Sequence, residues 1–224
     1  MELLAPAGSR KALTAAVQSG ADAVYLGGPR FGARYSAENF TIEEMKTWVD
    51  YCHLYGVDVH VTVNILVKEK EIESLKEYLK QLNEIGVDAL IVQDLGAVEI
   101  IKKTVPDMTL HASTQMTVTS LEGVKYLEDM GFSRVVLARE LSEKEIEHIC
   151  KNAKAEIEVF VHGAICICYS GQCLMSSILG GRSGNRGRCA QPCRLPYDLL
   201  ENGKTVKSGY VLSPKDMALV NDLG

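Results

Sequence analysis

Residues 20–28 read GADAVYLGG, and the same kind of phrase returns as GVDVHVTVN at 56–64 and GVDALIVQD at 86–94. A fourth copy, GFSRVVLARE, occupies residues 131–140. Each phrase opens with a glycine at the end of a helical pattern, where a left-handed cap is favoured. Each continues with a short apolar run, which is typical of a strand buried on both faces. The repeat therefore predicts successive βα units around a parallel sheet.

Helical spacing of apolar residues fills the gaps between these phrases. It predicts helices over residues 9–19, 42–55, 68–85, 95–104, 119–130 and 142–152. Further strands are expected within 2–8, 109–115 and 156–163. Seven alternating strands favour an α/β fold of the (β/α)8 TIM type, lacking its last strand, over a doubly wound sheet. No GxGxxG motif follows the first strand, which argues against a dinucleotide-binding sheet.

The chain divides into three predicted parts. Residues 1–165 are βα barrel units, and residues 166–212 form a Cys/Arg-rich insertion on the barrel rim. A polar turn at Asn202-Gly203 between apolar runs predicts a hairpin within that insertion. Residues 213–224 should begin the final barrel unit, and DMALVNDLG reads as a helix. We expect the missing strand to come from further chain or from a homo- or hetero-oligomer.

Composition sets broad limits on the class of protein. The 224 residues are 46% hydrophobic and 24% charged, as in ordinary globular proteins. A net charge of −5 argues against a chain that coats nucleic acid over its whole surface, but it permits a local basic patch. The sequence shows neither a secretory signal nor a long apolar stretch, so no membrane association and a cytoplasmic location are expected.

Five of the seven cysteines fall between residues 166 and 193. In a reducing compartment this density points to a metal or redox site rather than to disulfides. Four thiolates can hold a cubane iron–sulfur cluster of the [4Fe-4S] type or a tetrahedral zinc ion, and the loose spacing favours the cluster. The candidate ligands are Cys166, Cys173, Cys189 and Cys193, with Cys168 as the spare that could replace Cys166.

Polar side chains gather where the predicted strands end, which is the face of a parallel barrel that carries active sites. The expected substrate-binding residues are Tyr25, Asn64, Gln93, Asp94, Gln115 and Arg139. The expected catalytic residues are His111, His162 and Glu140. The simpler alternative is that strand ends are polar because loops begin there.

The loop GGRSGNRGRCAQPCR, residues 180–194, carries four arginines and no acid. Arg182, Arg186 and Arg188 could bind an RNA backbone or a small anionic substrate. A solvated loop is the alternative, and the arginines could also offset the negative charge of a thiolate-bound cluster. No HExxH, GxSxG or P-loop motif is found, so a hydrolase has no recognisable machinery in this sequence.

The stretch EVFVHGAICICYSGQCLMS, residues 158–176, resembles the signature of the collagenase-like "peptidase U-32" family. The positions that match it are Glu158, Phe160, Gly163, Ala164, Ile165, Cys166, Gly171, Cys173, Met175 and Ser176. The segments LLAPAG, AVYLGG, HASTQM and GRSGNRGRCAQPCR are similar to the same family. The resemblance spans essentially the whole chain.

This resemblance implies a barrel-shaped domain and, in many members, an iron–sulfur cluster. It also implies oxygen-independent hydroxylation of a tRNA or rRNA base, with prephenate as the hydroxyl source in some cases, or a role in ubiquinone synthesis. A few members are described as collagen-degrading peptidases. We therefore expect an iron–sulfur-dependent RNA-modifying enzyme, with a collagenase-like peptidase as the alternative and a non-catalytic scaffold as a third hypothesis.

The chain departs from the family pattern at one place. Family members often carry a further cysteine soon after the sequence SPKD, whereas here Met217 and Ala218 follow it. The fourth cluster ligand is therefore open between Cys193, Cys168 and none.

Overall fold

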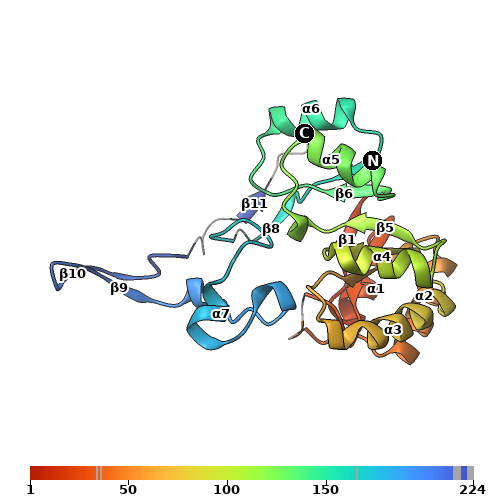
Figure 1. The fold of residues 1–224 in the computed structure, drawn as a ribbon, viewed down its shortest axis with the longest axis horizontal. Helices are drawn as coiled ribbons and strands as arrows, with labels where there is room; N and C mark the ends of the chain where they lie inside the picture. Colours follow the sequence, from red (N-terminus) through yellow and green to blue (C-terminus); the bar gives the residue numbers. More distant parts are fainter. Residues whose placement is uncertain (34, 36, 165, 214–217, 221–224) are drawn as a thin grey trace.

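The computed structural model describes residues 1–33, 35, 37–164, 166–213 and 218–220 (Figure 1). Its body is a parallel sheet of seven strands that lie in chain order, from β1 to β7. The strands are β1 Leu4–Pro6, β2 Ala23–Gly27, β3 Asp58–Val63, β4 Ala89–Val92, β5 Thr109–Ala112, β6 Arg134–Val136 and β7 Glu156–Glu158. An order without reversal is that of a sheet curling toward a barrel, because a doubly wound sheet changes direction at a switch point.

Six helices alternate with these strands, as the sequence predicts. They are α1 Arg10–Gln18, α2 Ile42–Leu54, α3 Ile72–Glu84, α4 Leu95–Thr104, α5 Leu121–Asp129 and α6 Glu143–Asn152. Their apolar faces cover one side of the sheet, where Val59, Val61 and Val63 of β3 are fully buried. The fold class is therefore confirmed as α/β with a curled parallel sheet.

The glycines that open the repeated phrase cap the helices as expected. Gly20, Gly56, Gly86 and Gly131 all have φ between 69° and 85°, the left-handed region that glycine enters without a steric penalty. They lie in four of the six connections from a helix to the next strand, all of which are three or four residues long. Connections from a strand to the next helix are more varied, from two residues after β4 to the fourteen of segment 28–41.

The inner face of the sheet is polar. His60 and His111 are 3% and 4% exposed, and their rings meet edge to face with centroids 4.6 Å apart. Arg134 lies on the same face, since it pairs with His111 across β5 and β6. The interior of a (β/α)8 barrel is usually filled by branched apolar side chains, so this lining is unusual.

Arg134 draws the two ends of the curled sheet together. Its Nη1 and Nη2 donate to the two carboxylate oxygens of Glu2, each at 2.6 Å, just before β1. Its Nε donates to Glu156 of β7 at 2.8 Å. A charge-assisted, bidentate pair of this kind fixes geometry as well as contributing energy. The pair therefore links the start of the chain to its sixth and seventh strands.

Beyond β7 the structure differs from the expected pattern in two places. Residues 156–163 were expected as one strand, but β7 ends at Glu158 and a separate strand, β8 His162–Ala164, follows. The terminal helix expected in 213–224 is also wrong for its described part, because Ala218–Val220 forms β11 and pairs antiparallel with β8. A short helix is marginal on its own, whereas a strand here satisfies the backbone of β8. The remainder of 213–224, apart from Ser213, lies outside the described residues.

The predicted hairpin is present. Strands β9 Tyr197–Glu201 and β10 Lys204–Gly209 pair antiparallel around Asn202 and Gly203, whose φ angles of 50° and 77° suit a two-residue hairpin turn. Figure 1 shows this hairpin extending away from the body, beyond the short helix α7 Met175–Gly180. None of the helices among the described residues combines the length and apolar character needed to span a bilayer.

Replacing Arg134 with methionine should destabilise the fold. The change leaves the half-buried carboxylates of Glu2 and Glu158 without their cation, which we expect to cost roughly 2–3 kcal/mol, below the 3–5 kcal/mol of a fully buried pair. Urea denaturation measures this loss. The control is Lys125→Met, which removes an exposed pair with Glu122 and should change stability by less than about 0.5 kcal/mol. Equal stability of the two variants would contradict the role given to Arg134.

Candidate functional site

The cysteine-bearing segment, residues 166–194, is fastened to the carboxyl face of the sheet. At one side the Ser170 carbonyl accepts a hydrogen bond from the Thr117 hydroxyl at 2.6 Å. The side chain of Gln172 donates a hydrogen bond to the same hydroxyl at 3.1 Å. Gly171 lies so close to the loop after β5 that an added Cβ would stand 2.0 Å from the Gln115 carbonyl oxygen. Only glycine, here with φ of 80°, fits this approach.

The other side of the segment meets the loops after β2 and β3. Gly187 packs against the backbone of Gly32, and its carbonyl accepts from the Tyr35 amide at 3.3 Å. The guanidinium of Arg186 forms a two-pronged pair with Glu71, at 2.9 and 2.6 Å. The cysteine-bearing segment therefore spans loops from four of the strands, because Arg139 after β6 also donates to Ser170 at 2.6 Å.

The five clustered thiols lie within electrostatic range of one another. Burial raises the pKa of Cys168, and the neighbouring Cys173 and Cys166 raise it further; Cys168 and Cys173 also hydrogen-bond. Burial likewise raises the pKa of Cys193, with added repulsion from Cys166, Cys189 and Cys173 and an opposing effect of Arg194. All four predicted ligands and the spare thus converge on this face.

The thiols of the cysteine-bearing segment are candidate donors for a metal group. Among the described residues, no three His, Cys, Asp or Glu side chains surround one point closely enough to hold a single metal ion. The thiols nevertheless include both exposed and half-buried members on one short segment. Thiolates of this kind hold iron–sulfur clusters as well as zinc. The identity of the ligands stays a prediction.

Several predicted strand-end residues lie in or just after the strands of the sheet. Asn64 after β3 accepts from the Ala33 amide at 2.9 Å and donates weakly to Ser113 after β5, at 3.4 Å. Gln93 after β4 is 8% exposed, and its Oε1 has no hydrogen-bond partner among the described residues. The Gln115 Oε1 is also buried without a hydrogen-bond partner among the described residues. Tyr25 of β2 is half-buried in the same sheet.

Two predicted substrate-binding residues, Asp94 and Arg186, make contacts that serve the fold. The carboxylate of Asp94 caps α4 through the Ala97 amide at 3.0 Å and accepts the Val67 amide at 2.9 Å. Arg186, predicted to bind RNA or an anion, is held by Glu71 and is half-buried. From the sequence alone, an acid at a helix start or an arginine in a basic loop could equally bind a substrate or make a local structural contact. In this structure both are occupied by local contacts.

His111 lies deeper than the sequence suggested. It stands opposite Arg134, the first residue of β6, and so faces the interior rather than the carboxyl face. Burial, with His60 and Arg134 adding to it, holds the pKa of His111 down at about 3, so the ring is neutral at pH 7. The two other predicted catalytic residues, Glu140 and His162, are exposed.

Glu158 is an interior group that the sequence argument used only as part of a signature. It ends β7, and its side chain is 19% exposed and 3.7 Å from Arg134. Because Arg134 already serves Glu2 and Glu156, it neutralises Glu158 only in part. Burial raises the pKa of Glu158 to about 7, against the opposing pull of Arg134. The sequence did hold a signal for this interior position, because Glu158 lies two residues after Glu156 and therefore on the same face of β7.

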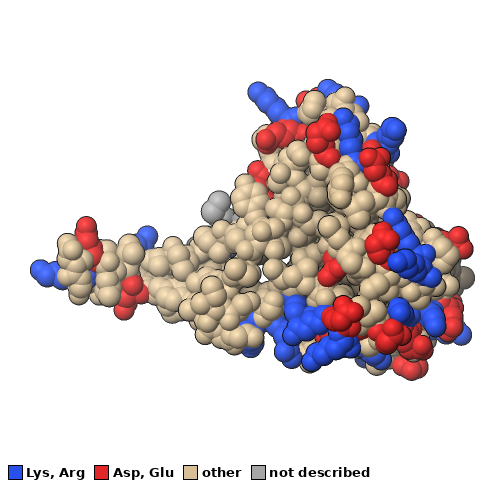
Figure 2. All heavy atoms as spheres, in the orientation of Figure 1, with Lys and Arg blue, Asp and Glu red and all other residues tan. Residues whose placement is uncertain are grey.

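Charged side chains are unevenly distributed over the surface. Figure 2 shows them gathered over the helices of the body and near the hairpin tip, while the face over α7 is largely uncharged. Leu174, Ile178 and Leu179 are the exposed apolar side chains there. Arg182 and Arg188 are exposed, and Arg188 lies over the ring of Tyr35 at 5.2 Å.

Residues 8–224 match the model of peptidase family U32, so the chain belongs to that family, as its signature implies. A solved U32 peptidase, Mk0906, has the same fold, with a TM-score of 0.61 and 21% identity over 73% of this chain and 70% of that one. Below 25% identity this similarity concerns the fold alone.

Curated relatives are more similar in sequence. The chain is 44% identical to a 23S rRNA 5-hydroxycytidine synthase of Escherichia coli, over 100% of this chain and 34% of the relative. It is 40% identical to tRNA hydroxylation protein P1 of Bacillus subtilis, over 99% and 54%. A collagenase of Porphyromonas gingivalis is 32% identical, over 98% and 56%. The chain thus spans about a third to just over half of these relatives.

Replacing Gly171 with alanine should detach the cysteine-bearing segment. Alanine adds left-handed strain of about 1–2 kcal/mol and the clash with Gln115. Gly20→Ala is the matched control, because Gly20 has a φ of 85° but nothing within 4 Å of its added Cβ. Trypsin should cut at Arg182 and Arg188 faster in Gly171→Ala than in Gly20→Ala. Equal cutting rates would show that the close approach is unimportant.

Replacing Glu158 with glutamine should change how stability depends on pH. The folded carboxyl keeps its proton up to about pH 7, whereas the unfolded one releases it near 4.5. The free energy of unfolding of the wild type therefore falls as pH rises through this window and is level above it. The variant should lack this fall, which amounts to roughly 2–3 kcal/mol. Urea denaturation at pH 5 and pH 8 measures it, and parallel curves for the two proteins would refute the raised pKa.

Proposed function

We propose that this chain is the iron–sulfur-dependent part of an enzyme that hydroxylates a base in tRNA or rRNA without oxygen. The observation that carries the proposal is the fastening of five thiols over the polar carboxyl face of the sheet. The similarity to rRNA and tRNA hydroxylation proteins supports RNA as the substrate class. We further infer that the curled sheet is the larger part of a (β/α)8 barrel, in line with its consecutive strand order.

Cys166, Cys173 and Cys189 would hold the cluster, with Cys193 or Cys168 as the fourth thiolate. Such a cluster supplies one-electron transfer or a coordination site for oxygen ligands when bound. The protein's own residues then bind and orient the reactants. The cysteine-bearing segment lies across the carboxyl face and would restrict water there, which would strengthen electrostatic contacts beneath it.

Arg139 would bind the carboxylate of a small anionic donor such as prephenate. Its guanidinium stands between the end of β6 and the cysteine-bearing segment, through Ser170 at 2.6 Å and the Phe160 ring at 5.9 Å. A planar guanidinium recognises carboxylates through two parallel hydrogen bonds. Arg182 and Arg188, both exposed, would contact RNA phosphates.

A collagenase-like peptidase is the second candidate, favoured by the relative from Porphyromonas gingivalis. It predicts that purified protein cleaves gelatin and that one nucleophile variant abolishes cleavage. The sequence offers no recognised hydrolytic motif to nominate that nucleophile, so the hydroxylation proposal fits the residues better.

The decisive test deletes the gene and restores it with cysteine variants. Cys166→Ser and Cys173→Ser should abolish the hydroxylated nucleoside in RNA digests, measured by mass spectrometry, and should lower iron and sulfide in anaerobically purified protein. Cys150→Ser is the control, since Cys150 is an exposed thiol on α6 away from the cluster of five. Full nucleoside levels in the Cys166 and Cys173 variants would contradict the proposal, and gelatin cleavage by the same samples would favour the peptidase.

A further inference from the structure

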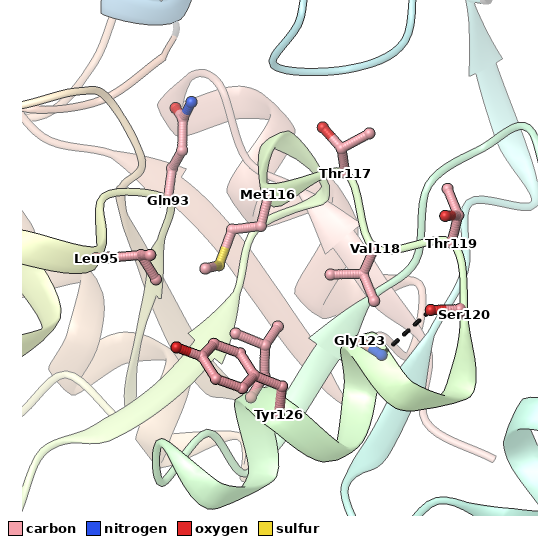
Figure 3. Close-up of a pocket in the computed structure, with 10 residues that line it drawn as sticks. Gln93, Leu95, Met116, Thr117, Val118, Thr119, Ser120, Gly123 and Tyr126 are labelled. Atoms are coloured by element: carbon pink, nitrogen blue, oxygen red, sulfur yellow. Dashed lines mark hydrogen bonds between the residues drawn. The ribbon is translucent and has the colours of Figure 1, made fainter.

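A hollow of about 360 Å³ opens beside the carboxyl ends of β4 and β5. It is bounded by the start of α4, the loop after β5 and the first turns of α5. Figure 3 shows Leu95, Met116 and Tyr126 pointing toward one another around this space. Its volume is at the lower end of the range for small-molecule sites, about 300–1,000 Å³. It therefore suits a single planar group rather than a large ligand.

The walls of this hollow are apolar, aromatic and neutral. Its lining is Gln93, Leu95, Met116, Thr117, Val118, Thr119, Ser120, Gly123, Tyr126 and Leu127. None of these residues carries a charge, so the hollow is ill suited to a carboxylate or phosphate donor. Tyr126 and Leu95 are 62% and 49% exposed, which leaves a ring and an aliphatic surface open to a flat partner. Aromatic side chains of this kind stack on unstacked bases.

The side chain of Gln93 takes no part in the proposed contact. Gln93 is 8% exposed, and Figure 3 shows its amide pointing away from Leu95, Met116 and Tyr126. The hollow therefore offers stacking surfaces to a flat ligand and no amide partner.

Thr117 ties the hollow to the cysteine-bearing segment. Its backbone is left-handed, with φ of 59°, a conformation that β-branched residues rarely adopt. Strain of this kind persists where surrounding contacts hold it, and it gathers at functional sites. The contacts here are the hydrogen bonds from Thr117 to the Ser170 carbonyl and from Gln172 to Thr117. The hollow thus adjoins the segment that carries the thiols.

We propose that this hollow binds one unstacked base of single-stranded RNA, stacked against Tyr126 and Met116. This inference rests on the proposed function. It places the RNA base in the hollow, whereas the anionic donor is assigned to Arg139. A base held here would be a pyrimidine, the type named for the rRNA relative. The neutral lining and the exposed ring match a base better than they match the donor.

The test measures RNA binding by the 224-residue chain, without requiring turnover. A short fluorescein-labelled oligouridine is titrated and its polarisation recorded. Tyr126→Ala should weaken binding about tenfold, the loss expected when one base–aromatic stack is removed. Tyr126→Phe should bind within about twofold of the wild type, because the ring is kept. Tyr55→Ala is the control, since Tyr55 follows α2 and is similarly exposed at 60%.

A crosslink locates the base. Oligouridine with one 5-iodouridine is irradiated with the protein, and adducts are mapped by mass spectrometry to the peptides that contain Met116 or Tyr126. Free uridine should compete only at far higher concentration, which distinguishes RNA from a free nucleoside. Wild-type binding by Tyr126→Ala, or adducts found only outside the hollow, overturns this inference.

The outcomes separate this inference from the proposed function. If the cysteine variants lose the hydroxylated nucleosides but RNA binding does not depend on Tyr126, only the base-binding role of the hollow is refuted. Binding that depends on Tyr126, with unchanged nucleosides, supports the hollow and refutes the proposed chemistry.

Discussion

The ion pairs of Arg134 hold the curl of the sheet on which everything else is placed. Glu2 stands before the first strand and Glu156 opens the seventh, and one guanidinium binds both. Coulombic attraction in a partly buried setting exceeds that of an exposed pair, because little water screens it. The same pairing leaves Glu158 only partly neutralised. Burial nevertheless keeps the pKa of Glu158 raised, to about 7.

The curl brings the carboxyl ends of the strands to one face, and the cysteine-bearing segment crosses that face. Its contacts differ in kind: a glycine against a carbonyl at Gly171, a hydroxyl bridge at Thr117, and a charged pair between Arg186 and Glu71. Close packing fixes the position of the segment, and the charged pair fixes its orientation. The thiols consequently converge although they are spread over 28 positions of the sequence.

The repeated units could be predicted from the sequence because their signals are local. Glycine caps such as Gly86 and apolar runs such as 89–92 depend only on neighbouring residues, and their boundaries agree with the structure within a few positions. The density of thiols near Cys166 was equally visible. The contacts of Asp94, Arg186 and His111 could not be predicted, since these partners lie 27 to 115 residues away in the chain or across strands. Tyr126 gave no signal at all, because an exposed tyrosine on a helix is ordinary until a hollow is found beside it.

The uniform turns that lead from helices into strands contrast with the uneven loops on the opposite face. Short glycine-capped turns keep the register of one unit with the next, so a length change there would disturb the whole sheet. Loops that leave the strands do not set this register. The longest of them, 28–41, contacts the cysteine-bearing segment through Tyr35. New specificity can therefore arise by lengthening or rewriting one face while the other preserves the architecture, which makes this domain a scaffold whose evolution is confined to a single side.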